Sequence, residues 1–286
     1  MKVAILGANG QLGTDLVECL QSRNIHTIAL THQDVPIENL DVLSATIDSL
    51  KPDVVINTAA FHVVPQCEEN PLRAYQVNAL GALNVARAAE KVGASDVYIG
   101  TDYVFDGKKR IPYVEDDIPN PLNVYASTKL LGEYYTLNYS AKGLVLRVSG
   151  LYGKTPCRAK GGNFITMILQ SAKVKQEVKV VNDEVLTPTP TREIAEKILE
   201  FLDVDAFGLF HLTAEGECSW YEFSRVIFDT LGVTTPLRAC SVSDFPAPVK
   251  RPMYSVLENA KAKSLGLPKM RHWRDSLVSF LRENYG

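Results

Sequence analysis

Short, continuously apolar runs alternate with longer amphipathic stretches along the first half of the chain. The apolar runs are residues 2–8, 26–31, 52–60, 95–101 and the beginning of 143–153. Between them, apolar residues recur at helical spacing over residues 11–23, 42–51, 70–93 and 124–139. Strands without polar alternation are typical of a parallel sheet covered on both faces. The pattern predicts an α/β fold of the Rossmann type, with a doubly wound parallel sheet.

The rhythm changes after about residue 153. A polar loop is followed by helices and short strand-like runs, and the chain ends in an amphipathic helix; these segments are residues 154–163, 178–183, 186–191, 208–214 and 272–284. We therefore predict a Rossmann domain over residues 1–153. Residues 154–286 are expected to form mainly a smaller C-terminal lobe, with segments that return to the main domain.

Composition narrows the class of protein. The 286 residues are 46% hydrophobic and 22% charged, with a formal net charge of -3, which suits a folded domain with a sizeable core. No basic stripe appears, so no nucleic acid is expected as a partner. No signal peptide and no apolar run of about 18 residues is found, so we expect no membrane segment. The five cysteines are scattered and odd in number, which favours a reducing cytoplasm. The histidines and cysteines lack metal-ligand spacing, so no structural metal is predicted.

Three glycines follow the first apolar run and open the first amphipathic stretch. Gly7, Gly10 and Gly13 form a GxxGxxG pattern, with Ala8 where the commoner fingerprint has its second glycine. A turn without side chains lets a pyrophosphate approach the backbone, and the helix N-terminus supplies free N–H groups. We therefore predict a dinucleotide site here. The second strand is followed by Thr31, His32 and Asp34, which do not decide between NADH and NADPH.

A tyrosine stands four residues before a lysine in the stretch over residues 124–139. Tyr125 and Lys129 lie on one helix face, so the ammonium can lower the phenol pKa from its usual value of about 10. Thr101 ends the fourth apolar run, at the sheet edge where such folds place ligands. Alone, the pair reads as an ordinary exposed helical pair. Together with the glycine turn, the three residues predict a redox site that acts on a carbonyl.

The chain resembles the extended short-chain dehydrogenase/reductases, and within them the dTDP-4-dehydrorhamnose reductase family. The resemblance spans nearly the whole chain and is carried by stretches such as GANGQLG, TDYVFDG, PYVEDD, YASTKLLGE and GLFHLTAEGECSWYEF. It implies an NADPH- or NADH-dependent reductase of a 4-keto-6-deoxy nucleotide sugar, with the lobe after residue 153 binding the substrate. Nucleotide-sugar dehydratases of this superfamily carry an Asp-Glu pair after the threonine, whereas Asp102 is followed here by Tyr103. This difference favours simple reduction over dehydration.

The resemblance also implies a role for individual residues. Thr101, Tyr125 and Lys129 would be catalytic, and Val64, Thr101 and Asp102 would face the sugar. The residues that would bind the cofactor are Gly7, Gly10, Gln11, Leu12, Gly13, Ala60, Phe61, His62, Tyr125 and Lys129.

Three positions depart from the reductase branch and leave the exact sugar open. Pro65 stands where the branch usually has an aspartate, and Gly150 where it often has a tryptophan that packs on the sugar. The loop over residues 182–189 lacks a glycine that usually precedes its turn. Another nucleotide-sugar reductase or epimerase therefore remains an alternative. So does a dinucleotide-binding regulatory subunit that resembles the β subunit of methionine adenosyltransferase. A homodimer and a divalent metal at an interface are left open.

Overall fold

The computed structural model of the chain describes residues 1–157, 159, 161–245, 249–267 and 269–286. Its main feature is a parallel six-stranded sheet, in the order β2-β1-β3-β4-β5-β10. The strands are β1 (Lys2–Leu6), β2 (His26–Leu30), β3 (Val54–Asn57), β4 (Ser95–Thr101), β5 (Gly143–Val148) and β10 (Gly208–His211). Every neighbouring pair in it is parallel, which confirms the predicted fold class.

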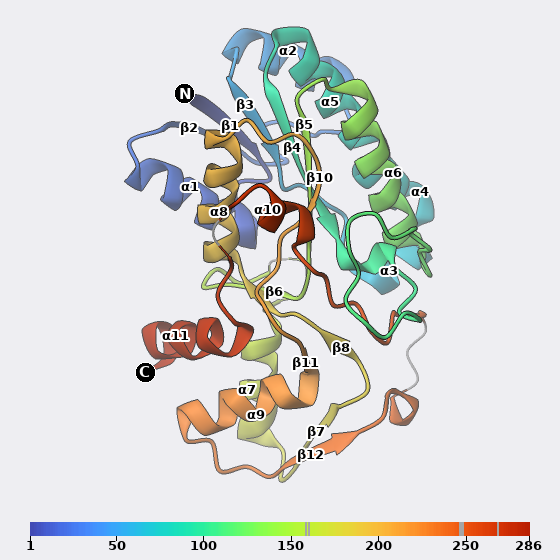
Figure 1. Ribbon diagram of the computed structural model, residues 1–286, viewed down its shortest axis with the longest axis vertical. Helices are drawn as coiled ribbons and strands as arrows, with labels where there is room; N and C mark the ends of the chain where they lie inside the picture. The colour runs from blue at the N-terminus through green and yellow to red at the C-terminus, as the bar shows by residue number, and fades with distance from the viewer. Residues whose placement is uncertain (158, 160, 246–248, 268) are drawn as a thin grey trace.

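Helices cover both faces of this sheet (Figure 1). They are α1 (Gln11–Ser22) and α8 (Thr191–Asp203) on one face, and α2 (Leu40–Leu50), α5 (Gly81–Val92) and α6 (Val124–Tyr139) on the other. Alternate residues of β1 serve the two layers: Val3 and Ile5 share a core cluster with α1 and α8, and Ala4 and Leu6 share one with α2 and α5. Burial of β1 on both sides explains why it carries no polar alternation.

The chain reverses its direction of winding at β1. β2 pairs with one edge of β1 and β3 with the other, so the carboxyl ends of β1 and β3 flank a topological switch point. The Thr58 hydroxyl, just after β3, donates to the carbonyls of Leu6 at 2.8 Å and Gly7 at 3.1 Å. This edge of the sheet is therefore where a ligand crevice is expected.

The region between β3 and β4 is more broken than its pattern suggested. One helix was predicted over residues 70–93. The structure has a short helix α3 (Val64–Glu69), then α4 (Pro71–Ala74), a π-helical segment η1 (Tyr75–Leu80) and α5 in direct succession. The predicted extent is thus helical, but its centre is wound more widely. Helical periodicity does not distinguish an α-helical from a π-helical turn, and π-turns are often found at functional sites.

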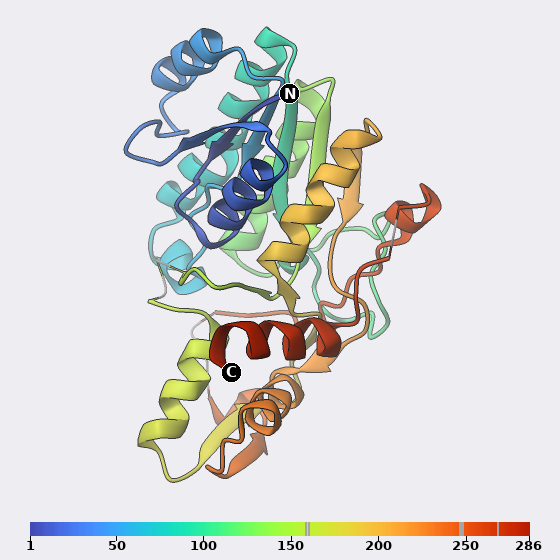
Figure 2. The same ribbon diagram turned by 90° about the vertical axis from the view of Figure 1, so that its left-hand side faces the viewer.

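A second group of elements lies beyond the carboxyl edge of the sheet (Figure 2). It holds the helices α7 (Phe164–Val174), α9 (Trp220–Leu231) and α11 (Trp273–Tyr285), with β7 (Val178–Val181) parallel to β12 (Leu237–Cys240) and β8 (Val185–Leu186) antiparallel to β11 (Cys218–Ser219). Its core is rich in aromatic rings: Tyr152 packs against Phe280 at a centroid distance of 5.1 Å and against Phe223 at 5.5 Å. A separate hydrophobic core is what allows this group to form a lobe of its own.

Segments after residue 153 return to the main body. α8 packs on α1, and β10 pairs with β5 as the last strand of the main sheet. Residues 208–211 of the predicted run over 208–214 thus belong to the Rossmann sheet, where Phe210 packs into the sheet's core cluster, whereas Ala214 packs in the core of the lobe. A short parallel pair, β6 (Leu151–Tyr152) with β9 (Thr189–Pro190), joins the two bodies.

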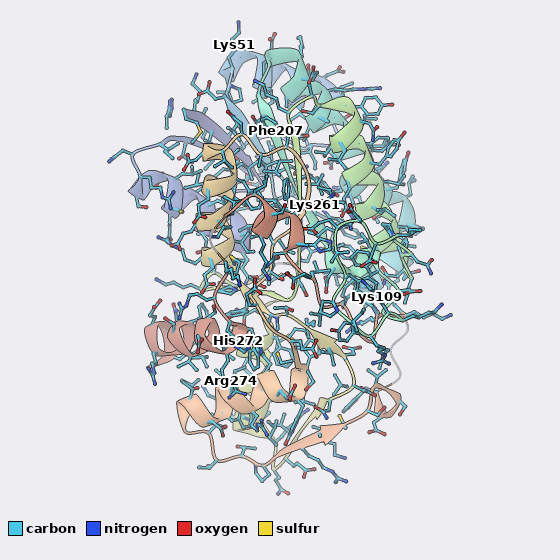
Figure 3. All side chains as sticks on the ribbon, viewed as in Figure 1. Lys51, Lys109, Phe207, Lys261, His272 and Arg274 are labelled. Atoms are coloured by element: carbon cyan, nitrogen blue, oxygen red, sulfur yellow. The ribbon has the colours of Figure 1, made fainter. Side chains whose placement is uncertain are left out.

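The long connection after β4 forms an ion pair with the last part of the chain. After the 3-10 turn η2 (Asp102–Val104), Lys109 Nζ lies 2.5 Å from Asp117 Oδ2 within this connection, and Lys261 Nζ of α10 (Ala260–Ser264) lies 2.8 Å from Asp116 Oδ1. Figure 3 labels Lys109 and Lys261. Another 3-10 turn, η4, spans Val242–Asp244.

Among the described residues, no helix is both long and apolar enough to cross a bilayer.

Candidate active site

The glycine turn has the geometry that a bound pyrophosphate requires. Gly7 has φ +79°, and a Cβ there would lie 2.9 Å from the Ala59 nitrogen; a Cβ on Gly13 would lie 2.4 Å from the Gly7 carbonyl oxygen. The N-cap residue of α1 is Gly10, which provides no side-chain cap, so the first N–H groups of the helix stay available to an anion. The Leu12 side chain is buried in the core, and only its backbone N–H can serve a ligand.

The segment after β3 is held by an asparagine that the sequence analysis did not single out. Asn78 Oδ1 accepts from the Phe61 N–H at 2.8 Å, and its Nδ2 donates to the Phe61 carbonyl at 2.9 Å and to Thr128 Oγ1 at 3.1 Å. Asn78 lies in the π-helical segment and is buried. It therefore ties the predicted cofactor segment to α6. The sequence carried little signal of this role, because Gln76 and Asn84 are polar residues in the same helical stretch.

The other residues predicted in this segment are close to the glycine turn or to the lobe. Ala60 and His62 lie beside Phe61, and His62 Nε2 is 3.2 Å from Cys157 Sγ, which follows β6 in the loop that leads to the lobe. Val64 begins α3 and is buried, with Pro65 in the first turn of that helix. Gln11 Nε2 donates to the Gly153 carbonyl at 3.5 Å.

Thr101 and Tyr125 meet at the carboxyl end of β4. Tyr125 is the second residue of α6, whose start is capped by the Asn123 side chain, which accepts from the Ala126 N–H at 2.9 Å. Burial raises the pKa of the Tyr125 phenol, and a hydrogen bond with the Thr101 side chain opposes that rise. The expectation that Lys129 lowers the pKa of Tyr125 is therefore wrong here: burial raises this pKa, and the phenol carries its proton at neutral pH. A protonated phenol is suited to donate that proton.

Lys129 lies one helical turn from Tyr125 and is only 3% exposed. Its Nζ stands 3.9 Å from the centroid of the Tyr98 ring, a cation–π contact on β4. Burial lowers the pKa of Lys129 to about 7, and the charge of Glu133 raises it. Lys129 can therefore lose its proton near neutral pH, so the charged groups beside it decide at which pH it stays positive.

Glu133 continues the same face of α6 and is paired inside the protein. Arg147 of β5 donates to it through Nε at 3.0 Å and Nη2 at 2.8 Å, and both side chains are at most 3% exposed. A Cβ on Gly100 would lie 2.7 Å from Glu133 Oε1, so the glycine of β4 makes room for the pair. The sequence analysis did not single out Glu133, and its partner Arg147 lies on another element.

Asp102 is buried and connects three segments. Its carboxylate accepts from Ser149 Oγ at 2.8 Å, Ser255 Oγ at 2.6 Å and Thr101 Oγ1 at 3.2 Å. Burial raises its pKa to about 6, against the lowering effect of these hydroxyls. The predicted sugar contact by Asp102 would therefore involve a carboxylate that already accepts hydrogen bonds from Thr101, Ser149 and Ser255.

Two of the three departures from the reductase pattern lie against each other. Gly150 has φ +53°, and a Cβ there would stand 2.9 Å from both Leu186 Cδ1 and Pro188 Cα. The loop over residues 182–189 thus packs on the glycine at the point where a side chain would begin. A tryptophan at this position would need a different backbone conformation and a displaced loop.

The predicted catalytic residues and the glycine turn share the carboxyl edge of one parallel sheet. This is the architecture of nicotinamide-dependent short-chain dehydrogenase/reductases, and we assign the chain to the extended branch of that class. The family model described as RmlD substrate binding domain matches residues 1–285, and the chain belongs to this family.

Individual relatives are similar over their full length. The spore coat polysaccharide biosynthesis protein SpsK of Bacillus subtilis (strain 168) is 36% identical over 282 residues, which covers 99% of this chain and 97% of that protein. A solved dTDP-4-dehydrorhamnose reductase of Clostridium acetobutylicum ATCC 824 is 40% identical, with a TM-score of 0.95 and 99% of both chains covered. The dTDP-4-dehydrorhamnose reductase of Bacillus anthracis str. Ames, solved in complex with NADP, is 33% identical, with a TM-score of 0.94 and 99% of this chain and 100% of that one covered.

Proposed function

We propose that this chain reduces the C4 ketone of dTDP-4-dehydrorhamnose, with NADPH or NADH as the hydride donor. The observation that carries the proposal is the contact between Thr101 and Tyr125 at the carboxyl end of β4, with Lys129 one turn further along α6. The relatives that bear the reductase name, which match the whole chain, support the choice of substrate.

The three side chains have distinct tasks in this reaction. A reduced nicotinamide cofactor, when bound, would supply the hydride that C4 of the sugar accepts. Tyr125 gives its proton to the ketone oxygen, so that a hydroxyl forms, and Thr101 holds that oxygen by a hydrogen bond. The positive charge of Lys129 stabilises the phenolate left on Tyr125.

The residues present fit a dinucleotide. Glycine at positions 7 and 13 leaves the backbone open where side chains would clash, and the uncapped start of α1 offers N–H donors to a pyrophosphate. Ala60, Phe61 and His62 would line the cofactor next to this turn. Residues 1–153 would hold most of the cofactor, and the lobe formed mainly after residue 153 would hold the nucleotide of the substrate.

The direct test is the oxidation of NADPH or NADH at steady state with dTDP-4-dehydrorhamnose as substrate. Turnover with a kcat/KM above about 10⁴ M⁻¹s⁻¹, within the ordinary enzyme range, would establish the activity. Weak turnover of this substrate, with a preference for another 4-keto nucleotide sugar, would indicate that the contact between Gly150 and the loop over residues 182–189 has changed the substrate preference. Cofactor binding without turnover of any ketone would contradict the proposal and favour a regulatory subunit.

A further inference from the structure

A row of polar side chains crosses the main sheet towards the candidate active site. In the parallel pairing of β10 with β5, His211 is the partner of Arg147, and Arg147 is in turn the partner of Gly100 on β4. Arg147 Nη1 lies 3.5 Å from His211 Nε2, and Arg147 Nη2 lies 2.8 Å from Glu133 Oε2. His211, Arg147 and Glu133 are each at most 2% exposed. Because these groups are shielded from water, each depends on its neighbours for hydrogen-bond partners.

The imidazole of His211 is held in one orientation. Its Nδ1 atom lies 3.1 Å from the carbonyl oxygens of both Tyr113 and Glu258, so the ring hydrogen is assigned to Nδ1. Burial and the charge of Arg147 lower the pKa of His211 to about 3, so the ring is neutral at neutral pH. In this form the lone pair is on Nε2, the atom that faces Arg147. His211 therefore offers the guanidinium a hydrogen-bond acceptor.

Arg147 divides its donors between two neighbours. Nε and Nη2 face the Glu133 carboxylate at 3.0 Å and 2.8 Å, and Nη1 faces His211. The guanidinium is a rigid plane, so the direction of Nη1 fixes the direction in which Nε and Nη2 point. Without the acceptor on His211, Nη1 would lose a partner in a site shielded from water. A rotation of the plane towards another acceptor would pull Nε and Nη2 away from Glu133.

Glu133 connects this row to the predicted catalytic residues. It lies four residues beyond Lys129 on α6, and its charge acts on that lysine. Burial raises the pKa of the Glu133 carboxyl, and a hydrogen bond from the Thr101 backbone N–H opposes that rise. A Cβ on Gly100 would lie 2.7 Å from Glu133 Oε1, so the glycine before Thr101 lets the carboxylate approach the strand. A displaced Glu133 carboxylate would therefore affect both Thr101 and Lys129.

We propose that His211 is a positioning residue of the reaction. It orients Arg147, and Arg147 keeps the Glu133 carboxylate in place. Through that carboxylate, His211 acts on the position of Thr101 and on the electrostatic environment of Lys129. The inference rests on the proposed function, because it concerns the rate of that reduction.

The test replaces His211 with side chains that differ in reach. The amide oxygen of glutamine can take the place of Nε2, the shorter asparagine reaches only the place of Nδ1, and leucine fills the space without polar atoms. We expect His211→Leu and His211→Asn to lower kcat for dTDP-4-dehydrorhamnose by about three- to tenfold, less than the roughly hundredfold loss that a misplacement of about 1 Å can cause. His211→Gln should keep most of the activity. Cofactor affinity should stay nearly unchanged in all three variants.

A second comparison shows whether His211 acts through Arg147. The double variant Glu133→Gln with Arg147→Met removes the pair that His211 is proposed to orient. Adding His211→Leu to this double variant should cause no further loss of kcat, although the same change lowers kcat in the unmodified chain. A purely structural role of His211, through its bonds to the carbonyls of Tyr113 and Glu258, would lower kcat in both backgrounds.

The matched control is His26→Leu, at an exposed position of β2, which should leave kcat unchanged. Full activity of His211→Leu, or equal activity of His211→Gln and His211→Asn, would overturn the inference. So would an equal loss of kcat when His211→Leu is added to the unmodified chain and to the double variant.

The contact between His211 and Arg147 is also measured without turnover. In denaturant titrations, the losses of stability caused by His211→Leu and Arg147→Met should not add in the combined variant, because the two side chains share one contact. Additive losses would overturn the inference even in a chain that turns over no sugar. Absence of turnover by the unmodified chain would instead contradict the proposed function, so the two failures are distinguishable.

Discussion

The proton that the proposed reaction needs is stored on Tyr125. Burial keeps the pKa of this phenol above its ordinary value, and the contact with Thr101 aims it at the sheet edge. We expect Tyr125→Phe to lower the rate of reduction by about 10²- to 10⁴-fold, the usual loss for a general acid. Cofactor affinity should stay nearly unchanged, because the ring is kept. Steady-state rates with a parallel binding titration check both parts, and full turnover by the variant would contradict the role of Tyr125.

Gly150 is constrained by its own backbone as well as by its neighbours. Its φ of +53° lies in the left-handed region, and a Cβ would press on Leu186 and Pro188. We expect Gly150→Ala to lower the free energy of unfolding by about 1–3 kcal/mol more than the strain of a non-glycine residue in that region, because the added Cβ also meets Leu186 and Pro188. Gly93→Ala is the matched control, since Gly93 also has positive φ but has no neighbour within 4 Å of an added Cβ. Equal losses in denaturant titrations of the two variants would show that the loop yields freely.

At the scale of the element, α6 carries a row of functional side chains on one face. Tyr125, Lys129 and Glu133 follow each other at intervals of four residues, and β5 supplies Arg147 to hold Glu133. Glu133 raises the pKa of Lys129, which burial lowers to about 7. Loss of the carboxylate should therefore discharge the lysine at a lower pH.

We expect the rate of reduction by the unmodified chain to fall as the pH rises through the pKa of Lys129. In Glu133→Gln this fall should occur at lower pH, so that the rate at pH 8 is about three- to tenfold below that of the unmodified chain. The measurement is kcat/KM from pH 5.5 to 9. An alkaline limb at the same pH in both proteins would rule out an effect of Glu133 on Lys129.

A loss of rate caused by lower stability must be separated from one caused by the changed pKa of Lys129. Glu133→Gln leaves Arg147 buried without its partner, which destabilises a protein by about 3–5 kcal/mol. The matched variant combines Glu133→Gln with Arg147→Met, which removes both charges. We expect it to regain most of the stability and to keep the shifted alkaline limb.

At the scale of the whole molecule, one buried carboxyl makes stability depend on pH. Asp96, at the amino end of β4, is 1% exposed, and burial raises its pKa from 3.8 to about 8, with the Thr136 hydroxyl opposing the rise. Between these two pH values the folded chain keeps a proton that the unfolded chain loses. Its contribution to the free energy of unfolding is therefore full below about pH 4 and is lost as the pH rises to about 8.

We expect Asp96→Asn to unfold at higher denaturant concentration than the unmodified chain at pH 8.5, with the difference shrinking towards pH 5. Taking the difference between the two proteins cancels the other carboxyls of raised pKa, such as Asp102. Asp229→Asn, at an exposed position on α9, is the control and should show no such trend. A constant difference across the pH range would mean that Asp96 is ionised in the folded chain at all these values.

Much of this architecture was readable from local pattern. Apolar runs such as residues 2–6 form β-strands that are buried on both faces. Such strands need apolar residues at successive positions, and each run shows this directly. The glycine turn and the spacing of Tyr125 and Lys129 are also local, since a turn conformation and one helical turn involve only near neighbours in the chain.

What the pattern could not determine depends on contacts between distant segments. In the π-helical segment the Asn78 amide bonds Phe61 and Thr128, and on β10 Phe210 packs into the core of the main sheet; both contacts join segments that are far apart in the sequence. Arg73 of α4 reaches His32 just after β2, and Arg147 reaches Glu133, only after the strands have been ordered. The sequence by itself therefore determined the fold class and predicted which residues form the catalytic set. The tertiary structure decided which charged groups lie around that set and beyond the end of β2, because electrostatic fields act through space and not along the chain.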